Sequence, residues 1–93
     1  MLFMYIHTHP LEKCIIEKPE ETKKMFTQAQ AASQKAGIKI LGGYMAPHEH
    51  TAFMIFDAPD IVALEKVLVP MTAWGDAQLI PVMTFEQGLA MAQ

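Results

Sequence analysis

The four histidines are the residues of this chain best suited to chemistry, because they form two pairs with the same spacing. His7 and His9 flank a single residue near the start, and His48 and His50 do the same near the middle. Side chains two positions apart on an extended segment point to the same side. Neutral imidazoles bind transition metals, and near neutral pH they also accept protons. The pairs therefore predict a metal site or a general base, provided that the fold brings them together.

The leading hypothesis is a transition-metal site made from all four histidines. Imidazole nitrogen suits Zn, Cu, Ni or Fe, and Glu49, Asp76 or Cys14 are available to complete the coordination shell. The spacing matches no strong metal motif such as HExxH. The alternative for these histidines is that they face solvent, or that they bond to backbone carbonyls at strand ends.

A second hypothesis retains the histidines without a metal. His7 or His9 would act as the catalytic general base of a cofactor-independent enzyme on a small apolar or aromatic substrate. The residues expected to line its ligand pocket are Tyr5, Tyr44, Phe53, Trp74 and Asp76. For each aromatic residue, packing in the core is the competing interpretation. A third hypothesis is a binding or assembly subunit without catalysis, so whether the chain is an enzyme stays open.

Composition narrows the class of protein. The chain has 93 residues, a net charge of -3 and only 7 Lys and Arg residues, which argues against nucleic-acid binding. Its hydrophobic fraction of 52% is high for a small soluble domain and suggests a buried subunit interface. No window approaches the roughly 20 apolar residues of a membrane span. With one cysteine and no secretory signal at the start, we expect a cytoplasmic protein.

Hydrophobic periodicity and turn residues predict four strands and three helices within one domain, residues 1–93. The expected order is strand 2–9, helix 19–36, strand 38–45, strand 51–56, helix 57–70, strand 77–83 and helix 84–93. The first strand is apolar on both faces. Pro10 ends it and a loop runs to Lys18. Pro70 is expected to end or break the second helix, and Gly88 to interrupt the last one.

Smaller features of these elements are also predicted. The inner face of the first helix is expected to be Met25, Phe26, Ala29, Ala32 and Ala36. Gly42 and Gly43 predict a bulge or a close backbone approach in the second strand. Pro81 predicts that the last strand lies at an edge or has a bulge there, because proline cannot donate a ladder hydrogen bond.

The element order is β-α-β-β-α-β, the ferredoxin-like pattern. Right-handed crossovers predict an α+β fold with a four-stranded antiparallel sheet in the order 4-1-3-2 and both helices on one face. The other face of this apolar sheet would be bare, so a second copy is expected to cover it and form a dimeric α+β barrel. In this order all four histidines gather at one end of the sheet, where a small-molecule ligand could also bind.

Four segments resemble the DUF3303 family of small dimeric α+β barrel proteins. The similar segments are Gly37–Gly42, Thr51–Asp60, Leu64–Pro70 and Gln78–Val82. They are positions that define the fold, and the family's usual tryptophan after the proline is replaced here by Met71. The resemblance implies a superfamily that includes cofactor-independent monooxygenases, muconolactone-isomerase-like enzymes and proteins without known activity. It assigns no role to the histidines.

Overall fold

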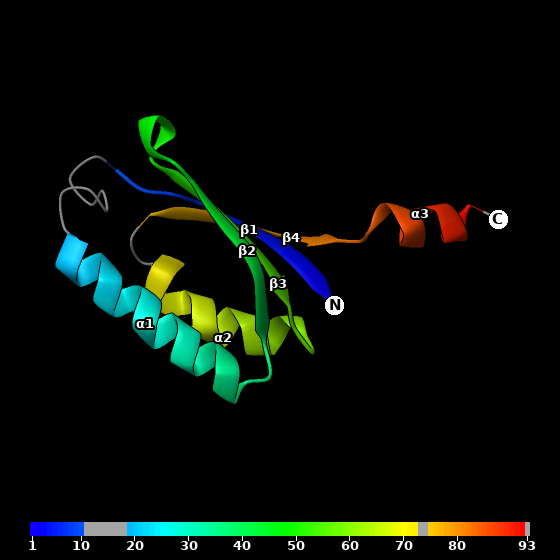
Figure 1. Ribbon diagram of the computed structural model, residues 1–93, viewed down its shortest axis with the longest axis horizontal. Coiled ribbons are helices and arrows are strands. Elements are labelled where there is room, and N and C mark those ends of the chain that lie inside the picture. Colours follow the sequence, from blue (N-terminus) through cyan, green and yellow to red (C-terminus); the bar gives the residue numbers. More distant parts are fainter. Residues whose placement is uncertain (11–18, 73–74, 93) are drawn as a thin grey trace.

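The computed structural model describes residues 1–10, 19–72 and 75–92 and confirms the α+β fold with a ferredoxin-like element order (Figure 1). Its elements are β1 (Leu2–Thr8), α1 (Pro19–Lys35), β2 (Lys39–Ala46), a 3₁₀ helix (Pro47–Glu49), β3 (Thr51–Asp57), α2 (Ile61–Thr72), β4 (Asp76–Val82) and α3 (Phe85–Met91). The predicted loop between Pro10 and Lys18 lies outside the described residues beyond its first residue.

The four strands form one antiparallel sheet in the order β2-β3-β1-β4, which is the predicted order read from the other edge. The central strand β1 pairs with β3 on one side and β4 on the other, so that Tyr5 lies opposite both Met54 and Leu79. The register of β2 shifts between Ile40 and Gly42, so the strand is irregular directly before the glycine pair. Pro81 lies on β4, an edge strand, as predicted.

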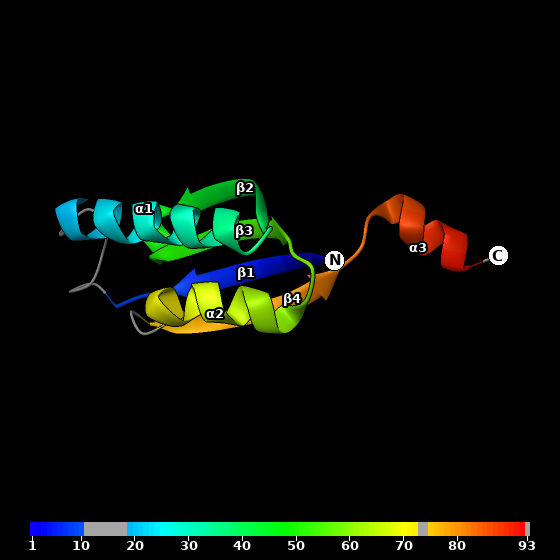
Figure 2. The ribbon, with the colours of Figure 1, turned by 90° about the horizontal axis from the view of Figure 1, so that it is seen from below.

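The core lies between the sheet and the helices α1 and α2, which cover the same face (Figure 2). Phe3, Tyr5 and His7 alternate along β1 and are all buried on this side. The buried apolar residues are Phe3, Tyr5, Ile38, Met54, Phe56, Ala58, Leu64, Val67, Leu68 and Met71. On α1 the predicted inner face is right except at Ala32, which is exposed, while Thr22 and Ser33 are buried.

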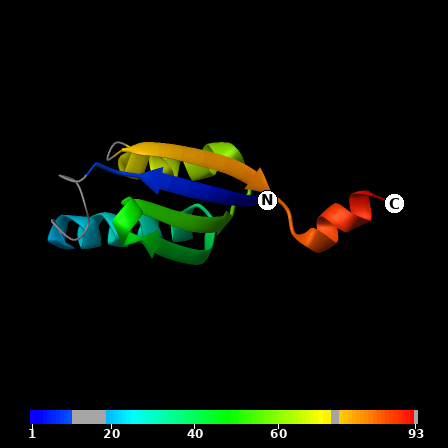
Figure 3. The ribbon, with the colours of Figure 1, turned by 90° about the horizontal axis from the view of Figure 1, so that it is seen from above.

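No helix covers the opposite face of the sheet in the described part of the chain (Figure 3). The strand registers put one apolar set on this face: Leu2, Met4, Ile6, Tyr44, Phe53, Ile55, Ile80 and Val82. We call it the bare face. Phe53, Tyr44 and Ile80 are exposed there. The expectation of a sheet that is apolar on both sides and covered on one is confirmed.

Two expectations about where helices end or are interrupted are wrong. Pro70 lies inside α2, which continues to Thr72 because Met71 packs into the core and the Thr72 hydroxyl donates to the Leu68 carbonyl at 3.1 Å. Gly88 does not interrupt α3, which is continuous from Phe85 to Met91. A capping box starts that helix: the Gln87 backbone N–H donates to the Thr84 hydroxyl, and the Thr84 N–H donates to the Gln87 side chain.

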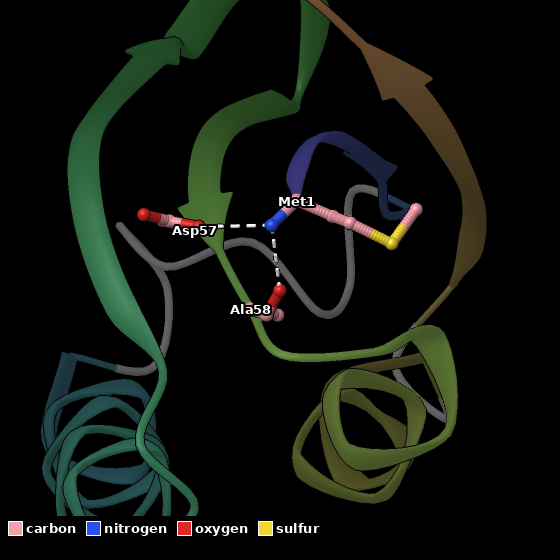
Figure 4. Close-up of polar contacts among 3 residues, drawn as sticks. All are labelled: Met1, Asp57 and Ala58. Carbon is pink, nitrogen blue, oxygen red and sulfur yellow. Dashed lines mark hydrogen bonds and ion pairs between the residues drawn. The ribbon is translucent and has the colours of Figure 1, made fainter.

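The N-terminal amine anchors the beginning of β1 to the end of β3 (Figure 4). The Met1 ammonium donates to Asp57 Oδ1 at 3.1 Å and to the Ala58 carbonyl at 2.9 Å. The Ala58 N–H in turn donates to the Met1 carbonyl at 2.8 Å. These bonds hold β1 and β3 together at the end of the sheet opposite to the histidines.

Candidate functional site: a row of imidazoles

Three of the four histidines form a row at one end of the sheet. His7 and His9 lie on the helix-covered side of β1 because strand side chains alternate, and His50 directly precedes β3. The ring centroids of His7 and His9 are 5.8 Å apart, and those of His9 and His50 are 5.6 Å apart. Tyr5 extends the row, since its ring stacks on His7 at 6.0 Å. The predicted gathering of histidines therefore holds for three rings.

The backbone fixes the two ends of this row relative to each other. The His9 N–H donates to the His50 carbonyl at 3.0 Å, which continues the β1–β3 ladder past Thr8. His50 has a φ of 49°, the only positive φ outside glycine among the described residues. A left-handed backbone is uncommon for residues other than glycine, although histidine adopts it more readily than most. His50 takes it because it ends the 3₁₀ helix, where its N–H donates to the Pro47 carbonyl at 3.2 Å.

Each ring of the row has a buried nitrogen without a hydrogen-bond partner. These atoms are His7 Nε2, His9 Nε2 and His50 Nδ1. Buried polar atoms are almost always bonded, so three unpartnered nitrogens in adjoining rings need an explanation. An unpartnered imidazole nitrogen is either an N–H without an acceptor or a lone pair without a donor. The second case leaves a nitrogen ready for a metal or a proton.

Electrostatics favour neutral rings. Burial lowers the pKa of His7, and the neighbouring His9 lowers it further, while a hydrogen bond with the Met71 backbone and the Asp76 charge partly oppose this. Burial also lowers the pKa of His9, with a further contribution from His50. Neutral imidazoles retain a lone pair, which both metal binding and base catalysis require.

The fourth predicted metal ligand, His48, lies outside the row. His48 and His50 were expected to share a side only if the turn stayed extended, but Pro47–Glu49 forms a 3₁₀ helix. His48 is exposed, whereas His50 is half-buried. Cys14, a reserve ligand, lies outside the described residues, as does Trp74. Among the described residues, no three His, Cys, Asp or Glu side chains are arranged to hold one metal ion between them.

The structure separates the predicted ligand-binding residues by face. Tyr5 is 1% exposed in the core, and its hydroxyl lies 3.4 Å from the Thr72 hydroxyl. Tyr44, Phe53 and Asp76 lie on the bare face, because they pair with or stand beside residues of that face. A single pocket of one chain cannot be lined by all of them. Alternation along the strands causes this separation. Tyr5 directly precedes Ile6, which pairs with Phe53, so the side chains of Tyr5 and Phe53 point to opposite faces of the sheet.

Two residues that position the row were not predicted from the sequence. The backbone of Met71, in the last turn of α2, bonds to His7. Gly75 packs so closely on the end of β1 that a Cβ atom there would overlap the Thr8 carbonyl oxygen and lie 2.8 Å from His9 Cα. A glycine two residues before the predicted strand 77–83 was the available signal for close backbone approach.

The fold and the site define a small α+β protein of the ferredoxin-like type with imidazoles at one end of its sheet. More particularly, the chain belongs to the family described as "Domain of unknown function (DUF3303)", whose model matches residues 1–93. The resemblance seen in four segments thus extends over the whole chain.

Among solved structures, the chain is similar to SCO4226 from Streptomyces coelicolor A3(2), with a TM-score of 0.60 and 15% sequence identity. The match covers 90% of this chain and 100% of that one. At this identity the likeness shows the fold alone. No curated protein matches the chain in sequence. Within residues 1–10, 19–72 and 75–92, no helix is both long and apolar enough to cross a membrane.

Proposed function

We propose that this protein is a cytoplasmic homodimer that binds a divalent transition metal through neighbouring imidazoles of the row His7, His9 and His50, two to each metal ion. The observation that supports the proposal best is the row itself, in which each of three adjoining rings has a buried nitrogen without a partner. Metal coordination supplies a partner for such nitrogens. Neutral imidazole suits Zn, Cu, Ni and Fe, so the donor set selects a class of ion and leaves the choice within it open.

The ring separations support coordination by neighbouring pairs. With a metal–nitrogen bond of about 2.1 Å, two imidazoles on one metal hold their ring centroids roughly 5 to 6 Å apart. Both neighbouring pairs fall in this range, at 5.8 Å and 5.6 Å. The metal would therefore take two imidazoles from the row and retain open positions. A water molecule or a small-molecule ligand would fill these positions, as in zinc sites that keep an exchangeable ligand.

The hydrogen bond between His7 and the Met71 backbone supports the same function. Histidines that bind metals usually donate their second ring N–H to a carbonyl or carboxylate, which fixes the ring and its tautomer. The Nε2 atom of His7 has no partner, so Nδ1 is the nitrogen left for the Met71 bond. The Nε2 lone pair would then be available to a metal ion.

The homodimer is supported by the bare face. An apolar sheet face without a covering layer is unusual for a monomer of this size. The chain exposes 6532 Å², about 1,100 Å² more than the roughly 5,400 Å² expected of a compact monomer of its mass. A stable interface buries about 800 Å² per partner, so coverage of the bare face by a second copy would account for much of the excess. The single cysteine suits a reducing compartment, which supports the cytoplasmic assignment.

A titration with Co²⁺ tests the metal proposal, on protein purified without a histidine tag. We expect binding to wild-type protein, loss of binding in His9→Leu, and unchanged affinity in His48→Leu, the matched control outside the row. In ¹⁵N spectra the imidazole signals of His7, His9 and His50 should shift with the diamagnetic ion Zn²⁺, while that of His48 stays. Wild-type protein that binds neither ion, or a His9→Leu variant that binds like wild type, would contradict the proposal.

A second function is favoured by the setting of His7. This ring is 6% exposed, stacks on Tyr5 and has a lowered pKa, so it is a neutral base shielded from water. His7, or His9 beside it, would then take a proton from a small substrate without a metal. The Co²⁺ titration separates the two functions, because a general base requires no metal ion.

A further inference from the structure

The C-terminal helix α3 extends away from the body of the protein (Figures 1 and 2). Its apolar side chains are largely in solvent: Phe85 is 94% exposed, Leu89 68% and Met91 73%. Within the described chain, no residue of α3 belongs to the hydrophobic core. A fully exposed phenylalanine on an ordered helix is a poor arrangement for an isolated molecule, because its apolar surface stays in contact with water.

The helix is too short to be stable by itself. It has seven residues, whereas isolated helices shorter than about 12 residues are marginal in water. The Thr84–Gln87 capping box fixes its beginning, which favours a preformed helix over a disordered tail. Gly88 in its middle opposes helix formation. Packing of the apolar side chains against another surface would stabilise the helix.

The chain's own body does not provide that surface for Phe85 and Leu89. These two residues are four positions apart and share one side of α3. Another side of the helix, with Gln87 and Met91, faces back toward the sheet and lines an open groove of about 670 Å³ with Met1, Leu2 and Val82. The side with Phe85 and Leu89 is therefore left for another molecule.

The molecule's dimensions agree with an extended arm. Its principal extents are 49 × 30 × 17 Å, and its radius of gyration is 14.2 Å, against about 12 Å for a compact domain of this length. The arm follows β4 after two residues, and Val82, the last residue of β4, lies on the bare face.

We propose that α3 is an arm that packs on a second copy of this chain, with Phe85 and Leu89 as its anchors. This inference builds on the proposed homodimer and adds the element that holds the two copies together. In a two-fold symmetric pair each arm contacts the same surface of the other copy, so every anchor counts twice. The surface it fits is the second copy's bare face, which is apolar and uncovered.

A second copy satisfies both unpaired surfaces at once. The excess exposed area of about 1,100 Å² exceeds the roughly 800 Å² per chain that a stable interface buries, so the bare face and the arm together are sufficient. Only one residue of α3 is charged, Glu86, so the helix suits a largely apolar counterpart. The bare face offers that counterpart on the same chain.

Hydrogen exchange combined with sedimentation tests the arm. In wild-type protein the amides of residues 85–91 should be protected at high concentration and should lose protection on dilution together with dissociation of the dimer. Phe85→Ser should remove this protection and raise the dimer dissociation constant roughly 100-fold, since two phenylalanines leave the interface together. Val69→Ser is the matched control, because Val69 is an apolar residue of α2 that is 61% exposed on another surface.

The outcomes distinguish the arm from the dimer. A dimer with unprotected α3 amides, or one in which Phe85→Ser dissociates no more readily than Val69→Ser, would overturn the arm and leave the homodimer standing. A single chain at every concentration would overturn both proposals. Loss of the dimer in Phe85→Ser with folded chains by circular dichroism would support the arm.

Discussion

His9 and His50 are joined twice across the end of the sheet: the His9 N–H donates to the His50 carbonyl at 3.0 Å, and their rings meet edge to face at 5.6 Å. The backbone bond is part of the sheet ladder, so the ring pair is held by secondary structure on both sides. Sites built on such rigid elements keep their geometry before a ligand arrives. This relationship makes the pair the fixed centre of the proposed site.

The free energy of unfolding should rise with pH across the titration of His7 and His9. Both have a pKa below the ordinary 6.5 in the folded protein, so the unfolded chain binds more protons. Their contribution is fully present above pH 6.5 and is lost as pH falls through the folded pKa values. Urea unfolding at several pH values between 5 and 8 measures it. Equal midpoints across this range in wild-type protein would refute the expectation.

Replacing His9 by leucine should stabilise the fold while it removes the site. The variant eliminates a buried unpartnered nitrogen and retains an apolar body, so we expect a gain of about 1 kcal/mol in the free energy of unfolding at pH 7.5. The gain should grow at lower pH, because one depressed pKa is removed. Urea unfolding of His9→Leu beside His48→Leu provides the comparison. A loss of stability in His9→Leu would mean that its ring has a structural role.

Gly75→Ala should disturb the site through the backbone. The new Cβ would overlap the Thr8 carbonyl oxygen, so the end of β1 must shift and His9 moves with it. We expect a loss of about 1 to 3 kcal/mol in unfolding free energy and weaker Co²⁺ binding. Gly88→Ala is the matched control: its Cβ would lie 3.7 Å from Met83 Sδ, an ordinary contact, and should stabilise α3 by about 0.5 to 1 kcal/mol. Equal effects of both substitutions would contradict this account.

Extending the chain before Met1 should weaken the sheet slightly. An added residue removes the ammonium that bonds to Asp57 and Ala58. Both charged partners of the ion pair are more than one-third exposed, at 63% and 46%, so the expected loss is at most about 1 kcal/mol. Thermal unfolding of protein with an N-terminal or a C-terminal two-residue extension measures it. Asp57→Asn in the N-terminally extended protein should then have little further effect, because its partner is already gone.

Sequence patterns predicted the fold well because strand and helix periodicities agree with it along most of the described chain. The alternation of Phe3, Tyr5 and His7 with Leu2, Met4 and Ile6 already implied two apolar faces, and the element order fixed which strands are central. The prediction that Pro70 ends or breaks α2 was wrong because it considered only the backbone hydrogen bond that proline cannot make. Packing of Met71 in the core outweighs the loss of that one bond. Tertiary contacts of this kind cannot be read from a single residue type.

The candidate site could be predicted from the sequence only in part. The antiparallel order of β1 and β3 placed His7, His9 and His50 at one end, and this follows from topology alone. The position of His48 depended on whether a five-residue turn stays extended, which its sequence leaves open. The division of Tyr5 from Tyr44 and Phe53 was missed because their faces depend on register, including the bulge before Gly42.

The anchor at Met1 has a consequence for the histidines at the far end of the same strand. If β1 slid by two residues against its neighbours, every side chain would stay on its own face, so hydrophobic burial alone barely penalises the error. The ammonium, however, would leave Asp57, and His9 would take the place of His7. The Met1 ammonium thus fixes the register of β1 and with it the position of the imidazoles, about 25 Å away along the strand.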